Sequence, residues 1–366
     1  MFERYVDRIC TDIQKAPHTA AELGGQLDRA VDSIYLGGGT PTVLESEQLE
    51  RIFATLQQQF EVRPDAEVTV ECAPGTLTPA MLETLLGCSV NRVSLGVQSF
   101  VDQEAAAVGR LHKRETVLQD IARLRAVGIT NINIDLIAGL PHQTAESWEF
   151  SLAEAIASGA PHVSVYMLEV DEDSRLGREL LAGGTRYHAH FVPNEGSMAD
   201  FYLAACGSLQ SAGIAQYEIS NFARENFESR HNLKYWKRLP YFGFGVDAHS
   251  MLTSATPDID AVRFAPADSL DQYISSVALQ RTAVSHPAAL EESFFLGLRL
   301  TRGVSLRELS TKFGDDAIER ARITIAELVD HGLMRLQGDV ASLTSRGRLL
   351  SNEVLERFIL AEESVR

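Results

Sequence analysis

The stretch Ser33–Leu44, SIYLGGGTPTVL, decides the fold of this chain. It begins as a short apolar run typical of a buried strand and ends in three consecutive glycines followed by Thr-Pro-Thr. Glycine costs backbone entropy and has no side chain to pack, so three in a row indicate that the backbone approaches another chain segment or a ligand closely. Pro41 and Thr42 then favour the first turn of a following helix. The pattern does not match G-x-G-x-x-G, which disfavours a dinucleotide-binding Rossmann fold.

Five apolar, β-branched runs recur in the first half of the chain, with helical patterns between them. The segment 46–60, SEQLERIFATLQQQF, for example, places its apolar residues at helical spacing. Alternating strands and helices predict βαβ units with a parallel sheet, and five units in a row predict a barrel or part of one. The predicted strands are Val31–Gly37, Glu67–Cys72, Asn91–Gln98, Asn131–Ile137 and His162–Glu169.

Each predicted strand ends in glycine or in a polar side chain. In a parallel β/α barrel the carboxyl ends of the strands line the site. Any one of these residues could merely cap the next helix, but five in register indicate a binding site. We therefore place the glycine turn at the mouth of the barrel, where its backbone groups reach a ligand. The strand-end residues are Gly37–Gly39, Glu71, Gln98, Asp135 and Glu169.

The bulk composition limits the class of protein. With 366 residues, 45% of them hydrophobic, the chain can form one large domain and a smaller one around a substantial core. The net charge of −17 disfavours nucleic acid or an anionic membrane surface as a partner, because phosphate groups would be repelled. No apolar run has the length of a transmembrane helix and no signal-peptide core opens the chain, so we expect a cytoplasmic protein.

The four cysteines, Cys10, Cys72, Cys88 and Cys206, lie 62, 16 and 118 residues apart. No C-x-x-C pair is present, so the spacing predicts no local zinc or iron–sulfur loop. We expect four reduced and mostly buried thiols.

The pattern changes from about Leu209. The segment 213–223, GIAQYEISNFA, predicts another strand with polar residues at its end, namely Glu218, Ser220 and Asn221. It leads into Arg230–Ser250, where His, Trp and Tyr lie among glycines, a composition unusual for a surface loop without a function.

The tail after about residue 285 shows two helical patterns, a hairpin and a last helix, which together predict a small winged-helix-like α+β domain. From Glu291 onward it carries 13 acidic and 11 basic residues. This balance disfavours DNA binding and favours internal packing or a lid.

Six motifs occur in a distinctive order: YLGGGTPTVL, VECAPGTLT, RVSLGVQSF, NINIDLIAGLP, YEISNFAR and SRHNLKYW. Together they resemble the radical S-adenosylmethionine (SAM) proteins related to oxygen-independent coproporphyrinogen III oxidase, and RHNLKYW and FGFGVDAHS point to the HemW-like, haem-chaperone branch of that family. The resemblance implies an α/β fold: a partial radical SAM (β/α) barrel over 1–208, the barrel end and aromatic loop over 209–285, and the C-terminal domain over 286–366.

The resemblance also implies a site for SAM. The G-G-G-T-P turn of the family contacts the amino acid part of this cofactor, whose ammonium group needs a carboxylate and whose carboxylate needs donors. Two alternatives stay open, because Arg110 could form a surface ion pair and Asp135 could cap a helix. The implied residues are Gly38, Gly39, Thr40, Glu71, Gln98, Arg110 and Asp135.

In the same branch the pattern H-N-x-x-Y-W is linked to haem, and it is present here as His231, Asn232, Tyr235 and Trp236. An imidazole can ligate iron, and aromatic rings can cover a porphyrin face. The alternative is a structural loop in which His231 hydrogen-bonds to the backbone. His249 is a second and weaker candidate.

The sequence departs from the family at the 4Fe-4S cluster, which the family holds on C-x-x-x-C-x-x-C upstream of the segment matching MFERYVDRICTDIQ. The cysteines present cannot supply that motif, so we expect weak SAM binding and no radical chemistry or catalytic residue in the chain as written. Either the start is truncated, with a strand and the cluster motif upstream, or a relative has lost the cluster. We favour truncation.

The resemblance thus predicts a haem chaperone that delivers haem to haem-accepting proteins. Two alternatives stay open: an oxygen-independent coproporphyrinogen III oxidase of porphyrin biosynthesis, and a cluster-less, non-catalytic binding scaffold. Whether the chain is an enzyme is left undecided.

Overall fold

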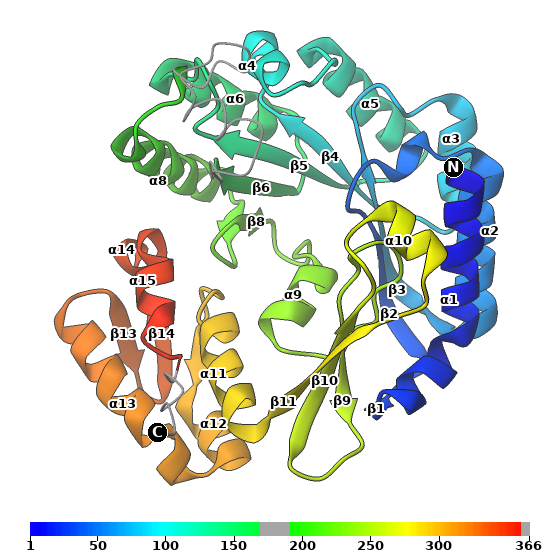
Figure 1. Ribbon diagram of the computed structural model, residues 1–366. Helices are drawn as coiled ribbons and strands as arrows, with labels where there is room; N and C mark the ends of the chain where they lie inside the picture. The colour runs from blue at the N-terminus through cyan, green and yellow to red at the C-terminus, as the bar shows by residue number, and fades with distance from the viewer. Residues whose placement is uncertain (169–190, 360–366) are drawn as a thin grey trace. The chain divides into compact units, whose positions relative to one another are not determined.

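The computed structural model describes residues 1–168 and 191–359, and Figure 1 shows their secondary structure. The strand end predicted at Glu169 lies outside the described residues. The chain forms two compact units. The first consists of Met1–Asp32, Arg51–Asp65 and Ser229–Arg366, and the second of Ser33–Glu50 and Ala66–Glu228.

A seven-stranded sheet with the order β2-β3-β4-β5-β6-β8-β7 carries the predicted βαβ pattern. Strands β3 to β6 pair in parallel, whereas β8 pairs antiparallel with β6 and with β7. The predicted α/β fold with a partial parallel barrel is confirmed. The strands are β2 (Ala30–Leu36), β3 (Glu61–Cys72), β4 (Arg92–Gln98), β5 (Asn131–Ala138), β6 (His162–Met167), β7 (Ala215–Gln216) and β8 (Asn221–Ala223).

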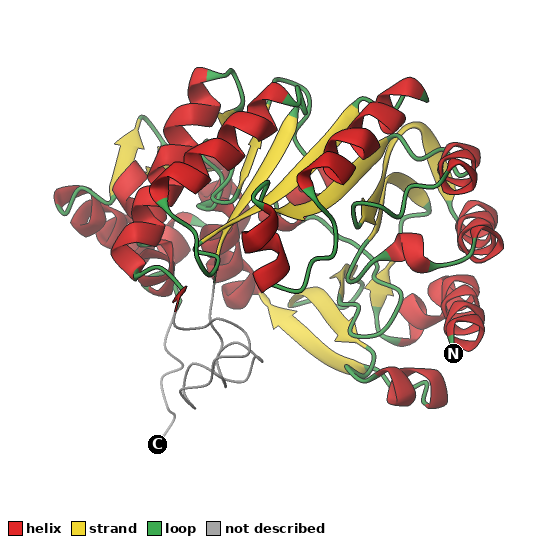
Figure 2. Ribbon diagram, turned by 90° about the horizontal axis from the view of Figure 1, so that it is seen from above, coloured by secondary structure: helices red, strands yellow, loops and turns green. Residues whose placement is uncertain are grey.

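Helices connect these strands: Figure 1 shows α5 and α6 beside them, and Figure 2 shows helices running along the sheet. Side-chain caps begin several of them: Thr78 caps α3, Thr144 forms a capping box with Ser147 in α6, and Asn194 caps α8. The helices and the short 3-10 turn are η1 (Pro41–Val43), α2 (Ser46–Gln59), α3 (Pro79–Gly87), α4 (Asp102–Ala107), α5 (Arg114–Ala126), α6 (Ala145–Ala157) and α8 (Glu195–Ser211).

Alternation along the central strands separates an apolar face from a polar one, because successive side chains of a strand point to opposite faces. The apolar face holds fully buried aliphatic residues, each of which contributes about 1.5–3 kcal/mol. They are Val93, Leu95 and Val97 of β4 and Ile132, Ile134 and Leu136 of β5. The opposite face carries Ser94, Asn133, His162 and Ser164, all of them buried.

The single strand predicted over 213–223 is wrong, because this segment is a hairpin of β7 and β8. The chain reverses between them, where the Tyr217 N–H donates to the Asn221 carbonyl at 3.1 Å. A parallel strand needs a long crossover connection, which the residues between β7 and β8 are too few to form. Strand β8 therefore pairs antiparallel, and Glu218 lies in the turn rather than at a strand end.

The first unit contains a four-stranded antiparallel sheet, β1-β9-β10-β11, that the sequence patterns do not predict. Its core holds Leu252, Val262 and Phe264 against Ala20 of α1. A Cβ at Gly25 would lie 2.9 Å from Leu252, so glycine is needed there. The elements are α1 (Phe2–Glu22), β1 (Gly25–Gln26), α9 (Arg230–Trp236), β9 (Ser250–Ser254), β10 (Ile259–Ala265), α10 (Leu270–Ser275) and β11 (Gln280–Ser285).

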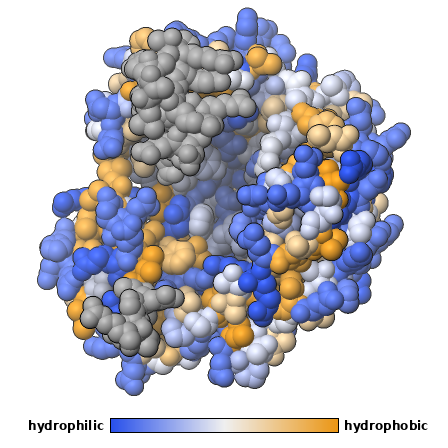
Figure 3. Space-filling view, in the orientation of Figure 1, coloured by the Kyte–Doolittle hydropathy of each residue, from blue (hydrophilic) through white to orange (hydrophobic). Residues whose placement is uncertain are grey.

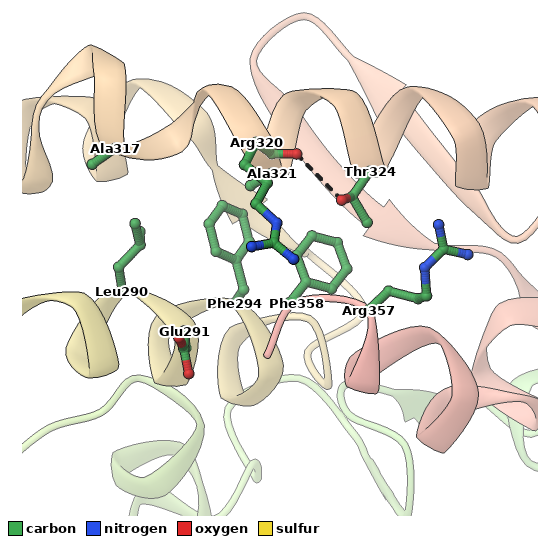
Figure 4. Close-up of a pocket in the computed structure, with 9 residues that line it drawn as sticks. All are labelled: Leu290, Glu291, Phe294, Ala317, Arg320, Ala321, Thr324, Arg357 and Phe358. Atoms are coloured by element: carbon green, nitrogen blue, oxygen red, sulfur yellow. Dashed lines mark hydrogen bonds between the residues drawn. The ribbon is translucent and has the colours of Figure 1, made fainter. Parts of the chain in front are cut away.

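The C-terminal part of the first unit has helices and a hairpin in the predicted order, with a three-stranded sheet β12-β14-β13. Figure 4 shows a pocket between α11, α13 and the residues that follow α15. The rings of Phe294 and Phe358 stack there, with their centroids 5.1 Å apart. The elements are α11 (His286–Gly297), β12 (Val304–Ser305), α12 (Leu306–Phe313), α13 (Asp315–Asp330), β13 (Met334–Gln337), β14 (Val340–Leu343), α14 (Ser345–Leu349) and α15 (Ser351–Glu356).

Hydrophilic residues predominate on the face shown in Figure 3, with hydrophobic ones scattered between them, as the large net charge leads one to expect. Among residues 1–168 and 191–359, no helix is long and apolar enough to cross a membrane.

Candidate functional site

The glycine turn after β2 gives each glycine a different role. A Cβ at Gly37 would lie 2.5 Å from the Tyr35 ring and 2.6 Å from the Glu71 carboxyl group, so packing requires this glycine. Gly38 has φ +79°, a conformation that favours glycine. No atom lies within 4 Å of a Cβ built at Gly38 or Gly39, so both face open space. Thr40 follows as the N-cap of η1.

Glu71, at the end of β3, is held in place by this turn. The Tyr35 hydroxyl donates to Glu71 Oε1 at 2.6 Å, and the Gly38 N–H donates to Glu71 Oε2 at 3.2 Å. Burial raises the pKa of Glu71, while the hydrogen bond from Tyr35 acts in the opposite direction. The second unit therefore presents an oriented carboxyl group beside an open glycine turn.

Asp135 lies on β5 among polar side chains of the neighbouring strands. Its Oδ2 accepts from Ser94 Oγ at 2.9 Å and its Oδ1 accepts from Asn133 Nδ2 at 2.8 Å. Burial raises the pKa of Asp135, and the hydrogen bonds that it accepts counteract this. The helix-capping alternative does not apply to the helix after β5, because Thr144 caps α6.

The side chains of Gln98 and Arg110 both lie near Gly96 of β4. A Cβ at Gly96 would lie 3.4 Å from Gln98 Nε2 and 3.9 Å from Arg110 Nη2. Gln98 is buried and has φ +67°, a left-handed conformation that costs about 1–3 kcal/mol in a residue other than glycine and is typical of functional sites. The pKa of His112, lowered mainly by burial, is lowered further by the neighbouring Arg110.

The second unit thus places two carboxyl groups, one guanidinium group and an open glycine turn on neighbouring strands and on the loops that follow them. Glu71 and Asp135 lie close enough that Asp135 contributes to the raised pKa of Glu71. Sequence reasoning missed the side chains that support them, although their alternation with apolar residues along each strand could have indicated them. They are Tyr35, Ser94, Asn133 and Ser164.

The H-N-x-x-Y-W segment forms α9 in the first unit, with Ser229 as its cap accepting from the Asn232 N–H. The rings of His231 and Tyr235 lie 4.9 Å apart at 90°, and Tyr235 meets Tyr241 at 4.6 Å. Burial and, to a smaller extent, the nearby Lys234 together lower the pKa of His231 to about 4.

Two other candidates lie outside this aromatic group. The Arg299 guanidinium group stacks over the Trp236 ring at 4.5 Å. The His249 side chain is 67% exposed, with Nε2 3.5 Å from Asp247. His231 and Tyr235 therefore lie in one aromatic group with Tyr241, which is not part of the motif. Trp236 lies beside Arg299 instead.

The cysteines do not form a metal centre in the part of the chain that the structure describes. Cys10, Cys72 and Cys88 are buried and Cys206 is partly buried. Burial raises the pKa of Cys72 and raises that of Cys88 to about 11, which disfavours the thiolates that a cluster requires. No group of three His, Cys, Asp or Glu residues among the described ones could hold a metal ion. The described residues therefore do not fit an iron–sulfur cluster.

Two known protein families match this chain, one in its N-terminal half and one near its C-terminus. The model of the Radical SAM superfamily matches residues 13–155, and that of the HemN C-terminal domain matches residues 284–350. Two curated relatives are named Heme chaperone HemW. The one from Bacillus subtilis is 35% identical over 94% of this chain and 89% of its own length. The one from Lactococcus lactis is 32% identical over 90% of this chain and 84% of its own length.

The structural comparison agrees on the fold. Coproporphyrinogen III oxidase (HemN) from Escherichia coli, a radical SAM enzyme, superposes with a TM-score of 0.80 at 24% identity, over 98% of this chain and 83% of that one. The predicted radical SAM type of the partial barrel, with its C-terminal domain, is confirmed.

Proposed function

The chain belongs to the HemW family, and from that premise we propose that it is a haem chaperone, which binds haem and delivers it to haem proteins. A cytoplasmic location stays a prediction from the sequence. The likeness to coproporphyrinogen III oxidase is one of fold, and no contact described above favours that activity for this chain.

The observation that carries the haem proposal is the environment of His231. With a pKa lowered to about 4, its imidazole is neutral at physiological pH, the form that ligates iron. The edge-on rings of Tyr235 and Tyr241 extend from it and offer aromatic surface to a porphyrin. We assign His231 as the axial ligand and Tyr235 as a side chain that contacts the macrocycle.

The second unit fits SAM. Glu71 would accept from the ammonium group, the glycine turn would approach the amino acid part, and Arg110 would pair with the carboxylate. When bound, this cofactor supplies a sulfonium centre linked to an adenosyl group. Because the described cysteines do not fit a cluster, we derive no radical step and assign no catalytic residue. The proposed contacts are Gly38, Gly39, Thr40, Glu71, Gln98, Arg110 and Asp135.

Haem titration of the full chain tests the first proposal. Haemin should give a saturable Soret band, and the loaded protein should pass haem to an apo-haem protein. His231→Ala should weaken haem binding about 10-fold or more, because it removes one ligand bond to the iron. A 10-fold loss of affinity corresponds to about 1.4 kcal/mol. His249→Ala is the comparison variant, because it removes the other candidate imidazole, which is exposed and belongs to the same unit.

Two results would contradict this assignment. A wild-type chain that binds no haem removes the proposed function. A chain in which His249→Ala, and not His231→Ala, changes the Soret band moves the axial ligand to His249.

A further inference from the structure

The residues behind Asp135 form a buried hydrogen-bond network that strand register creates. Asn133 is in register with Ser94 of β4 and His162 of β6, and Asp135 is in register with Ser164. Asn133 also precedes Asp135 by two residues and so lies on the same face of β5. Three parallel strands thus place these polar side chains side by side in a buried layer.

Asn133 is the centre of this network. Its Nδ2 donates to Asp135 Oδ1 at 2.8 Å and to Ser94 Oγ at 2.7 Å. Ser94 Oγ in turn donates to Asp135 Oδ2 at 2.9 Å, so both carboxylate oxygens are held. A carboxylate can only accept, and this determines which end of the Asn133 amide faces it.

His162 locks the amide in that orientation. Asn133 Oδ1 lies 2.5 Å from His162 Nδ1, and His162 Nε2 lies 2.9 Å from the Tyr217 hydroxyl. Because the amide oxygen can only accept, Nδ1 carries the hydrogen and Nε2 accepts from Tyr217. Burial lowers the pKa of His162 well below its ordinary value, which keeps the ring in this neutral form.

We propose that Asn133, locked by His162, is a positioning residue that presents the Asp135 carboxylate, as an acceptor of fixed orientation, to the hydroxyl groups of a nucleoside ligand. This inference rests on the proposed SAM site. Without the Asn133 donor, the buried carboxylate loses a hydrogen bond that favours its charged form. Asp135 would then be protonated at a higher pH and would lose acceptor capacity there.

Other groups that titrate or carry charge also face Asp135. Glu71 from β3, Tyr35 from β2 and Tyr166 from β6 each interact with it electrostatically, and Arg92 of β4 favours its charged form. A test must therefore observe Asp135 itself rather than a global pH profile.

The first measurement needs no ligand. The full chain is labelled with 13C-aspartate, and the Asp135 resonance is identified by its absence in Asp135→Asn. Asn133→Leu should raise the pKa of Asp135 by about one unit or more. Asn131→Leu is the matched control, because Asn131 lies two residues earlier on the same face and instead accepts from Arg92 Nη1.

The second measurement is calorimetric binding of SAM at about pH 6 and about pH 9. Asn133→Leu should weaken binding about 10-fold at the lower pH and recover most of it at the higher pH. If Asn133→Leu does not fold, Asn133→Ser replaces it, since one hydroxyl cannot supply both N–H donors.

An unchanged Asp135 pKa in the folded Asn133 variant overturns the inference. So does an affinity loss that is equal at both pH values, which a merely structural role would produce. If the wild-type chain binds no SAM, the proposed site fails, and the aspartate titration still decides whether Asn133 controls Asp135.

Discussion

Alanine at each position of the glycine turn should produce three different results, because the three glycines have different surroundings. At Gly37 the new Cβ would lie 2.5 Å from the Tyr35 ring and 2.6 Å from Glu71 Oε1, so these side chains must separate. Overpacking costs about 1–3 kcal/mol. Losing the hydrogen bond from Tyr35 to the Glu71 carboxyl group adds about 1.5–3 kcal/mol. Gly37→Ala should therefore lower the free energy of unfolding by about 2.5–6 kcal/mol.

The other two positions should respond mainly in ligand binding. Gly38→Ala places a side chain at φ +79° and should cost about 1–2 kcal/mol in stability. Gly39→Ala meets no atom within 4 Å and should change stability by less than about 0.5 kcal/mol. Because that open space is where we place the ligand, Gly39→Ala should nevertheless weaken SAM binding about 10-fold.

Urea denaturation and calorimetric titration of the same three variants measure both quantities. Gly37→Ala serves as the internal reference for a large loss of stability. If Gly39→Ala destabilises the chain as much as Gly37→Ala, the assignment of open space at Gly39 is refuted. If Gly39→Ala leaves SAM affinity unchanged while wild type binds, the ligand does not occupy the turn.

Three further predictions follow from the first unit. His231 has a folded-state pKa of about 4, below its unfolded value, so its contribution to stability is present above the unfolded pKa and is lost as pH falls toward 4. The free energy of unfolding should therefore depend less on pH in His231→Gln than in wild type across this range. An unchanged slope would contradict the burial of this imidazole. Tyr235→Leu should weaken haem binding more than Trp236→Phe does, since Tyr235 contacts His231 while Trp236 stacks on Arg299. The opposite order of affinities in a haem titration would place the porphyrin on the other side of α9. Gly25→Ala should destabilise the chain by about 1–3 kcal/mol, because its Cβ would lie 2.9 Å from Leu252; a denaturation midpoint equal to that of wild type would show that β1 adjusts freely.

The sequence by itself determined the features that depend on local pattern. Alternation of β-branched runs with helical segments predicted the parallel strands β3 to β6, because these periodicities repeat within a few residues. Glycine and proline at 37–41 located the turn after β2, since both residues act through their own backbone. The order of motifs was sufficient to identify the family.

Only the tertiary structure decided which residues meet. Strand register brought Asn133 beside Ser94 and His162, which lie 39 and 29 residues away in the chain. Packing against Tyr35 and Glu71 distinguished Gly37 from its two neighbours, although the three letters are identical. The 213–223 segment has the composition of one strand, yet it folds into the hairpin of β7 and β8, and β8 pairs antiparallel with the distant strand β6. Such contacts join residues far apart in sequence, and no local periodicity encodes them.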